Sequence, residues 1–282
     1  MATSHQAPAA QESCKQSSDF PTHKLSHKPY TKQPSRPVVL VGCGSYNPPT
    51  VMHMRMFELA NDELLKQGYD MWGGYLSPVS DAYGKASLVP AVHRLAMCEA
   101  AACSCPLTML DPWEARQPTY TPTLQVLRHV REQLHDWLAQ GHRPSNWPKD
   151  TQSQQAATND SREPGPQTEP KPQVMLLCGA DVLASFTIPG VWENPDALLE
   201  EHGVACIVRE GTDMEALLQH ELLKRHRNNI LVVPEPVPNS LSSTLIRKLV
   251  AEGRSVRYLV PNEVVDYLAN HAGVYNSASS HK

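Results

Sequence analysis

Short apolar segments of β-branched character alternate with amphipathic segments along most of this chain, and this alternation restricts the fold more than any other feature. The apolar segments have the length of strands, and the amphipathic ones have the apolar spacing of helices. Such alternation favours a parallel sheet covered on both faces, with right-handed crossovers. We therefore predict the α/β class, a doubly wound parallel sheet with a small C-terminal helical part. The predicted strands span residues 38–43, 71–77, 107–111, 174–178, 204–208 and 230–233.

Capping residues and apolar faces locate the predicted helices. Thr50 is a candidate N-cap, and Phe57, Ala60 and Leu64 form one apolar face that ends at Gly68. The other predicted helices are those at 91–102 with Val92, Leu95 and Ala96 inward, after Thr121-Pro122 with Leu127, Val130, Leu134 and Trp137 on one face, at 213–226, from the Ser242–Thr244 cap to Glu252, and from Pro261 with Val264, Val265 and Leu268 on its apolar side.

Proline marks two regions in which the alternation is absent. Eleven of the 25 prolines lie in residues 1–37 and 141–173, and both regions contain almost no Ile, Leu, Val or Phe. They cannot bury enough apolar surface to offset the entropy of ordering. We therefore expect a disordered N-terminal segment at 1–37, a disordered insert at about 141–173 and a C-terminal tail at 276–282. The remainder is expected to form one domain, residues 38–275.

Composition excludes several classes of protein. The formal net charge of −4 argues against a nucleic-acid binder that follows a phosphate backbone. No apolar run approaches the roughly 20 residues that span a bilayer. The seven cysteines form no Cys-x-x-Cys motif, which argues against a metal site and is typical of a reduced intracellular protein. We expect a cytoplasmic or nuclear location, and organellar targeting has weak support because the N-terminal segment carries acidic residues and a single arginine.

The loop after the first predicted strand carries the first candidate motif. Gly44 and Ser45 are small enough to let a ligand approach the backbone, and Thr50 and His53 share one face of the first helical turn. A helix N-terminus attracts anions through its free N–H groups and its dipole, and an imidazole there can donate to a phosphate oxygen. Asn47 stands where a G-x-G-x-x-G loop would need glycine. The alternative is that Thr50 only caps the helix and His53 is a surface residue.

The second candidate motif is Ser242-Ser243-Thr244-Leu245-Ile246-Arg247. It places hydroxyl groups at a helix cap and a guanidinium one turn further on. Backbone N–H groups, hydroxyls and an arginine that converge on one point form a site for a polyanion, because arginine can bind phosphate through two N–H groups. The alternative is an ordinary serine cap followed by a solvated arginine.

These two motifs, in this order and on an α/β background, resemble those of the eukaryotic type of nicotinamide mononucleotide adenylyltransferase. The family lies in the nucleotidylyltransferase superfamily, whose His-x-x-His or Thr-x-x-His signature is similar to Thr50-Val51-Met52-His53. The resemblance covers about residues 38–275 apart from the insert, and it implies a Rossmann-like nucleotidylyltransferase fold. The other segments that carry it are Gly44–Pro48, Ser77–Lys85, Asp111–Glu114, Leu176–Asp181, Ser242–Arg247 and Arg257–Pro261.

The resemblance implies a role for individual residues. It makes His53, Lys85 and Arg247 the catalytic set, with His53 bonded to the α-phosphate of ATP. From the residues alone, Trp113 and Trp192 are more typical of a protein core or its rim, whereas the resemblance assigns them to the nicotinamide ring. The residues implied on the ATP side are Gly44, Ser45, His53, Gly179, Asp181, Glu235, Asn239, Ser243, Thr244 and Arg247, with Arg55 near the phosphates. Those implied on the mononucleotide side are Ser45, Tyr83, Lys85, Trp113, Val191 and Trp192.

The activity that the resemblance implies is transfer of AMP from ATP to the 5′-phosphate of nicotinamide or nicotinate mononucleotide. The products are NAD or deamido-NAD and pyrophosphate, and Mg²⁺ is expected to enter with ATP. A phosphate oxygen is already anionic at neutral pH, so direct in-line attack needs neither a general base nor a covalent intermediate. The alternatives are another adenylyl- or cytidylyltransferase of the same superfamily and an additional chaperone-like role. Assembly as a homo-oligomer and the preferred mononucleotide are left open.

Overall fold

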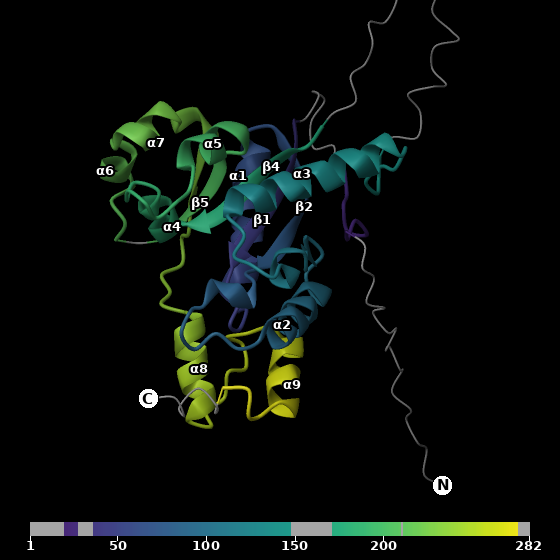
Figure 1. Ribbon diagram of the computed structural model, residues 1–282, viewed down its shortest axis with the longest axis vertical. Coiled ribbons are helices and arrows are strands. Elements are labelled where there is room, and N and C mark those ends of the chain that lie inside the picture. The colour runs from purple at the N-terminus through teal and green to yellow at the C-terminus, as the bar shows by residue number, and fades with distance from the viewer. Residues whose placement is uncertain (1–19, 28–35, 148–170, 210, 276–282) are drawn as a thin grey trace, which may run out of the picture.

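A parallel sheet forms the centre of the molecule (Figure 1). The computed structural model describes residues 20–27, 36–147, 171–209 and 211–275, and the six strands of this part are parallel in the order β3-β2-β1-β4-β5-β6. The order reverses between β1 and β4, and doubly wound sheets bind ligands in the crevice at such a point. The strands are β1 (Arg36–Gly44), β2 (Tyr69–Pro78), β3 (Thr108–Leu110), β4 (Gln173–Gly179), β5 (Val204–Val208) and β6 (Ile230–Pro234).

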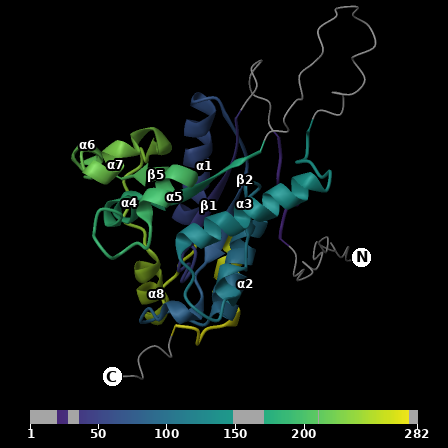
Figure 2. The same cartoon turned by 45° about the horizontal axis from the view of Figure 1, so that its top comes forward.

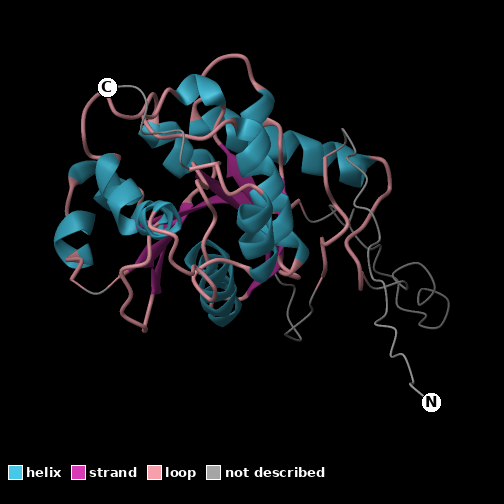
Figure 3. Cartoon of the chain, turned by 90° about the horizontal axis from the view of Figure 1, so that it is seen from below, coloured by secondary structure: helices cyan, strands magenta, loops and turns pink. Residues whose placement is uncertain are grey.

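The predicted class and sheet are confirmed, and β1 shows why its sequence indicated them. Val38, Val39, Leu40 and Val41 are all fully buried. Val39 and Val41 pack in an apolar cluster on one face of the sheet, and Val38 and Leu40 pack in a cluster on the other. Successive side chains of a strand point to opposite faces, so a strand covered on both sides needs a continuous apolar run. Figure 3 shows the strands lying between helices.

Each face of the sheet is covered by its own helices. Leu134 and Leu183 belong to the cluster that contains Val39, whereas Phe57 and Leu64 belong to the opposite cluster. The helices of the first face are α3 (Thr123–Ala139), α4 (Ala180–Ser185), α5 (Pro195–Glu201), α6 (Met214–Leu218) and α7 (Glu221–Arg225), and α1 (Val51–Lys66) covers the second.

The C-terminal helices form a third, smaller cluster and confirm the predicted C-terminal helical part. They are α8 (Ser243–Ala251) and α9 (Asn262–Asn270), which pack with α2 (Ala91–Cys103) around Met97, Ile246 and Val264. Figures 1 and 2 show α2 and α8 at the same end of the molecule. The start of α8 is thereby brought to the loop that follows β1, and the two candidate motifs meet.

The helices differ from the sequence expectation in several places. Val92 was expected to face inward but is 67% exposed, and α2 instead buries Arg94, Met97 and Cys98. The apolar pattern placed the buried face wrongly because a charged residue, Arg94, lies on it. The predicted helix at 213–226 is two short helices, α6 and α7, and the sequence did not predict α4 and α5, since helices this short give no readable period.

Residues 20–27 form an arm that packs on the domain, so the expectation of disorder for 1–37 was wrong for this stretch. Leu25 is 1% exposed and belongs to the apolar core. Lys24 Nζ donates to the carbonyl oxygens of Cys105 and Thr108, at 2.9 and 3.1 Å. One leucine and one lysine among polar residues do not form a readable apolar pattern, which is why composition failed here.

The ends of the predicted insert are also packed. Ser145 forms a β-bridge with Ser26 of the arm, and Gln173 is the first residue of β4. Ser145 and Gln173, at the two ends of the predicted insert, therefore belong to the folded domain. Residues 148–170, most of the predicted N-terminal segment and the tail 276–282 lie outside the described residues.

Candidate active site

A polar pocket lies where the loop after β1 meets the N-termini of α1 and α8. Its volume is about 220 Å³, and among its described lining residues are two cations and no carboxylate. Such a lining suits a polyanion. Six of the nine residues that line it are predicted site residues. The lining residues of this polar pocket are Ser45, Tyr46, Asn47, His53, Lys85, Ser87, Ser243, Thr244 and Arg247.

His53 presents a neutral hydrogen-bond donor to the polar pocket. Its Nδ1 accepts the backbone N–H of Thr50 at 2.9 Å, because Thr50 is the N-cap of α1. A backbone N–H can only donate, so the proton of the neutral imidazole is on Nε2. Burial, with the nearby positive charge of Arg209, lowers the pKa of His53 from 6.5 to about 4. At neutral pH the ring is uncharged, and its Nε2–H is free for a ligand oxygen.

The start of α8 is fixed to the loop after β1 by side-chain contacts. Ser243 Oγ donates to the carbonyl oxygen of Pro48 at 2.8 Å, and Arg247 Nη1 donates to that of Asn47 at 2.9 Å. Arg247 Nη2 donates to Thr244 Oγ1 at 3.2 Å. The cap of the helix is Ser242, whose hydroxyl accepts from the N–H of Leu245. These contacts hold a guanidinium, two hydroxyls and two helix N-termini around one cavity.

Three residues of the polar pocket had no predicted role. Tyr46 donates its hydroxyl to the carbonyl oxygen of Gly42 at 2.7 Å, and Asn47 Nδ2 donates to that of Ser87 at 2.7 Å. Tyr46 and Asn47 lie within the recognised Gly44–Pro48 segment, so the sequence held a signal for them. Ser87 has none, because only the folded loop brings it to the cavity.

Arg94 is a further residue that sequence reasoning missed. Its side chain is fully buried beside the polar pocket, where Nη1 donates to the carbonyl oxygen of Ser45 at 3.3 Å and Nη2 to Asp81 Oδ1 at 2.8 Å. Nε donates to the carbonyl oxygen of Val89 at 2.9 Å. One guanidinium therefore joins the loop after β1 to both ends of the loop that carries Lys85.

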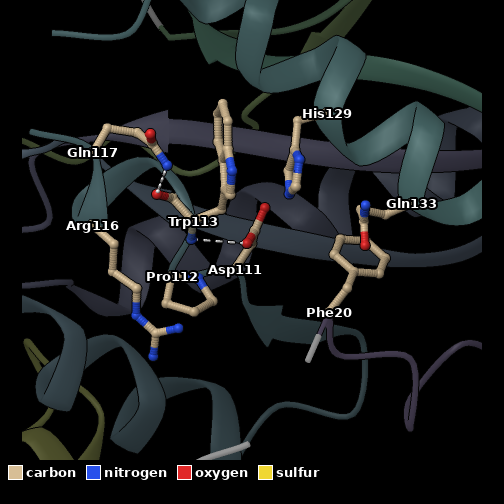
Figure 4. A pocket seen from close by; sticks show the side chains of 8 residues that line it. All are labelled: Phe20, Asp111, Pro112, Trp113, Arg116, Gln117, His129 and Gln133. Carbon is tan, nitrogen blue, oxygen red and sulfur yellow. Dashed lines mark hydrogen bonds between the residues drawn. The ribbon is translucent and has the colours of Figure 1, made fainter. Parts of the chain in front are cut away.

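A second pocket, of about 260 Å³, lies at the carboxyl end of β3 (Figure 4). The rings of Trp113 and His129 stack in it with centroids 4.1 Å apart and an angle of 9° between their planes. His129 belongs to α3, and Phe20 comes from the N-terminal arm. The lining residues of this aromatic pocket are Phe20, Asp111, Pro112, Trp113, Arg116, Gln117, His129 and Gln133.

Two buried carboxyl groups lie beside the aromatic pocket. Burial raises the pKa of Asp111 to about 6, against the opposing effects of the Trp113 N–H and of Arg116. Burial also raises the pKa of Glu114 to about 7, and the Ser77 hydroxyl, which donates to its Oε2 at 2.7 Å, opposes that rise. Unlike His53 in the polar pocket, both groups change charge close to neutral pH.

Of the six predicted mononucleotide residues, Trp113 lines the aromatic pocket, Ser45 and Lys85 line the polar one, and the other three line neither. Tyr83 is 46% exposed and stacks on Tyr120, with centroids 5.8 Å apart. Trp192 donates through Nε1 to Ser185 Oγ at 2.8 Å and packs on Phe186. Val191 is 55% exposed, and Lys85 lines the polar pocket.

The predicted adenosine residues follow the carboxyl ends of β4 and β6. Gly179 ends β4, and Asp181 lies exposed in the first turn of α4. Glu235 is buried, and its two oxygens accept from Arg55 Nε and Nη2 at 2.9 and 3.1 Å. Arg55 is thus bound to Glu235, which fixes the start of the loop containing Asn239. The contact of these residues with a ligand stays a prediction.

Two features are absent from the described residues. Among them, no three His, Cys, Asp or Glu side chains are grouped so that they could hold a metal ion. None of the helices in the described ranges is long and apolar enough to cross a membrane.

Solved structures share the fold. The nicotinic acid mononucleotide adenylyltransferase of Plasmodium falciparum, solved in complexes with APC and with NaAD, superposes with a TM-score of 0.56 at 14% sequence identity. The superposition covers 85% of this chain and 98% of that protein. At this identity the likeness concerns the fold alone, and it confirms the predicted Rossmann-like nucleotidylyltransferase fold.

Sequence relatives are much closer. A family model described as cytidylyltransferase-like matches residues 41–249. Nicotinamide/nicotinic acid mononucleotide adenylyltransferases of Oryza sativa subsp. japonica and Arabidopsis thaliana are 42% and 41% identical, over 89% of this chain and 92% and 95% of their own lengths. Nicotinamide/nicotinic acid mononucleotide adenylyltransferase 1 of Bos taurus is 40% identical over 87% of this chain and 91% of its own length. The chain therefore belongs to the nicotinamide/nicotinic acid mononucleotide adenylyltransferase family.

Proposed function

We propose that the polar pocket holds the phosphates of ATP, that the aromatic pocket receives the ring of a pyridine mononucleotide, and that the protein joins the two substrates. As a member of this family it is a nucleotidyltransferase of NAD biosynthesis, which transfers AMP from ATP to nicotinamide or nicotinate mononucleotide. The observation that carries the assignment of the two sides is the polar pocket, in which Lys85, Arg247 and the donor His53 meet two helix N-termini.

The proposed reaction is a direct in-line displacement. An oxygen of the mononucleotide 5′-phosphate attacks the α-phosphorus of ATP and forms a new phosphorus–oxygen bond, while the bond from the α-phosphorus to the bridging oxygen breaks and pyrophosphate leaves with the electron pair. The attacking oxygen is already anionic, so no side chain needs to remove a proton. Catalysis then consists of positioning and of stabilising the charge that develops.

His53 stabilises the α-phosphate in this proposal. The cap contact with Thr50 leaves its Nε2–H as the outward donor, and a neutral imidazole donates without needing to be charged at neutral pH. An oriented donor of this kind contributes about 3 kcal/mol to transition-state stabilisation.

Arg247 and Lys85 receive the leaving pyrophosphate. Arg247 donates one N–H to the carbonyl oxygen of Asn47 and one to the hydroxyl of Thr244. A guanidinium has five N–H groups, so donors remain for phosphate oxygens. Ser243 and Thr244, with the N-terminus of α8, add hydroxyl and backbone donors. Lys85 lies on the loop between β2 and α2 and adds a point charge on a long side chain.

Mg²⁺ enters as part of the ATP substrate. The polar pocket offers cations, hydroxyls and an imidazole, whereas Mg²⁺ prefers anionic oxygens and is commonly bound through substrate phosphates. The lining therefore fits a magnesium–triphosphate complex whose metal is held by the nucleotide. When bound, the metal neutralises charge on the departing pyrophosphate.

The remaining predicted residues are proposed at the two ends of the dinucleotide. On the mononucleotide side, Trp113 is proposed as a wall of the aromatic pocket, and Trp192, Tyr83 and Val191 are proposed to contact the mononucleotide from outside that pocket. Ser45 and Gly44 are proposed to line the channel between the substrates. Gly179, Asp181 and Asn239 are proposed at the adenosine end, together with Glu235. Since both oxygens of Glu235 bind Arg55, the role of this pair is to fix the loop.

A coupled assay tests the proposal directly. With ATP, Mg²⁺ and either mononucleotide, we expect equal amounts of dinucleotide and pyrophosphate. Replacing ATP by CTP separates the activity from that of a cytidylyltransferase of the same superfamily. Pyrophosphate formed without a dinucleotide, or product formed only with CTP, would contradict the proposed substrates.

A further inference from the structure

Arg94 places a guanidinium group inside the protein. Its side chain is fully buried on the inner face of α2, whereas that of its carboxylate partner, Asp81, is 57% exposed. Removing a charge from water is costly, and apolar side chains can often replace a buried ion pair without loss of stability. The neighbouring buried positions of α2, such as Met97 and Cys98, are apolar. Stability alone therefore does not account for a charge at this position.

The contacts of Arg94 close the loop between β2 and α2. Its Nη2 donates to Asp81 Oδ1 at 2.8 Å, and its Nε donates to the carbonyl oxygen of Val89 at 2.9 Å. Asp81 Oδ2 in turn accepts the backbone N–H of Ala91 at 3.0 Å. One guanidinium and one carboxylate thus join the beginning of the loop to its end.

The middle of this loop carries Lys85 and depends on these anchors. Residues 81–87 are all exposed, and Lys85 lines the polar pocket. Within the part of the chain that the structure describes, the Lys85 ammonium group has no hydrogen-bond or ion-pair partner. One further contact reaches the loop, from Asn47 Nδ2 to the carbonyl oxygen of Ser87 at 2.7 Å. The backbone of the loop therefore sets where the charge of Lys85 lies.

The remaining contact of Arg94 reaches the other side of the polar pocket. Nη1 donates to the carbonyl oxygen of Ser45 at 3.3 Å, and Ser45 belongs to the loop that leads from β1 to His53. The planar fork of an arginine can bind acceptors on both loops at once. One rigid group thus connects the segment that carries Lys85 with the segment that carries His53.

We propose that Arg94 is a positioning residue for the reaction, which holds Lys85 at the distance from the loop after β1 that the phosphates of ATP require. This inference rests on the proposed function, because it takes the polar pocket to hold those phosphates. Arg94 itself is buried and acts through Lys85. A displacement of a reacting group by about 1 Å can lower a rate about a hundredfold, so the anchor of an exposed loop can matter as much as a group that touches the substrate.

Arg94→Lys is the first test variant, because lysine keeps the positive charge and loses the planar fork. We expect kcat per folded enzyme to fall about ten- to a hundredfold. The KM values for ATP and for the mononucleotide should change much less, because Lys85 acts mainly on charge that develops in the transition state. Circular dichroism at the assay temperature gives the folded fraction to which kcat is referred.

A double-variant experiment shows whether Arg94 acts through Lys85. In a chain that already carries Lys85→Ala, Arg94→Lys should lower kcat little further, because the group that it positions is absent. In a chain that carries Arg247→Ala, the same change should lower kcat by its full factor, because Arg247 is held by contacts of its own. Non-additive effects of this kind identify residues that act together.

Asp81→Asn is the second test variant and serves also if Arg94→Lys does not fold. The exposed Asp81 side chain tolerates the change, and loss of its charge loosens the guanidinium. We expect a smaller fall in kcat with the same dependence on Lys85. Arg128→Lys is the matched control, since it makes the same replacement in an arginine that pairs with Glu201 between α3 and α5, and it should leave kcat unchanged.

Three results would overturn the inference while the proposed function stands. They are an unchanged kcat in both Arg94→Lys and Asp81→Asn, the full loss of kcat from Arg94→Lys in the Lys85→Ala chain, and an unchanged kcat in Lys85→Ala alone. An equal loss in Arg128→Lys would make the effect one of stability only and would also overturn it. Failure of the wild-type enzyme to form either dinucleotide would refute the proposed function itself.

Discussion

The polar pocket and the aromatic pocket are assembled in different ways. The polar pocket is built mainly from two short segments, Gly44–His53 and Ser242–Arg247, each of which runs into the start of a helix. The aromatic pocket takes one residue from the arm, a loop after β3 and two residues from α3. A pocket made of contiguous motifs can be recognised in a sequence, whereas one made of scattered residues becomes visible only in the fold.

The two pockets also differ in charge and in their response to pH. The polar pocket holds cations and an imidazole whose pKa is lowered to about 4, so its charge is constant across the neutral range. The aromatic pocket lies beside two carboxyl groups with pKa values of about 6 and about 7. We therefore expect the chemical step to depend on the polar pocket, and the change of stability with pH near neutrality to come mainly from the carboxyl groups beside the aromatic one.

The largest expected effect comes from His53→Ala. Loss of the Nε2–H donor should reduce kcat roughly a hundredfold or more. The same change removes the acceptor for the Thr50 N–H, which should lower the free energy of unfolding by about 1 kcal/mol. Steady-state kinetics and thermal denaturation measure the two effects.

His53→Asn and His53→Gln separate the donor from the cap. The Asn amide reaches the position of Nδ1 and can keep the cap, whereas the Gln amide reaches the position of Nε2 and can supply a donor. We expect wild-type stability with low kcat for Asn, and partial recovery of kcat for Gln. Near-normal turnover in His53→Ala would mean that the polar pocket takes no part in the chemical step.

The next effect concerns the two tryptophans. If Trp113 and Trp192 contact the pyridine ring, each alanine variant should raise the KM for the mononucleotide about ten- to a hundredfold, because ring stacking contributes about 1–3 kcal/mol. The KM for ATP should change much less. Equal increases for both substrates would mean that the tryptophans only support the fold. Phe186→Leu is a useful control for Trp192, since Phe186 is the buried ring on which it packs.

Glu114→Gln tests the difference in pH response. In the folded chain the pKa of Glu114 is about 7 instead of the ordinary 4.5, so the folded state keeps its proton when the unfolded chain has lost it. The raised pKa makes the wild type less stable as the pH rises from about 4.5 to 7. Above pH 7 this loss of stability stays constant. The variant should therefore be more stable than the wild type by about 1–3 kcal/mol at pH 8 and similar to it at pH 4.5. Denaturant titrations at both pH values measure the difference.

For His53 in the polar pocket, we expect stability to change with pH in the opposite direction. The pKa of His53 is lowered, so the unfolded chain binds the proton first as the pH falls below 6.5. The wild type then loses stability toward pH 4. His53→Asn should gain relative to the wild type over that range, whereas Glu114→Gln should gain with rising pH. The same sign for both variants would contradict the contrast between the pockets.

The sequence predicted the features that local segments form, and it missed those that depend on residues distant in the chain. The six strands were predicted because a strand covered on both faces, such as β1, must be continuously apolar. Six residues of the polar pocket were predicted because helix caps and the family motifs are local. Arg94 and His129 were missed, since a charged residue on a buried helix face and a histidine stacked on a distant tryptophan give no local signal. The arm was missed because Leu25 is the only buried residue among residues 20–27.

The smallest expected effect tests whether the arm belongs to the aromatic pocket or only covers it. Phe20 packs on Tyr75 with centroids 4.8 Å apart and lies 6.3 Å from the ring of His129. Phe20→Ala should widen the pocket and raise the KM for the mononucleotide a few-fold, about 1 kcal/mol or less, with no change in the KM for ATP. His23→Ala, on the exposed side of the same arm, should leave both constants at their wild-type values. Because Leu25 and Lys24 still anchor the arm in both variants, a change in the ATP constant alone would place the arm outside the mononucleotide side and reduce the aromatic pocket to residues 111–133.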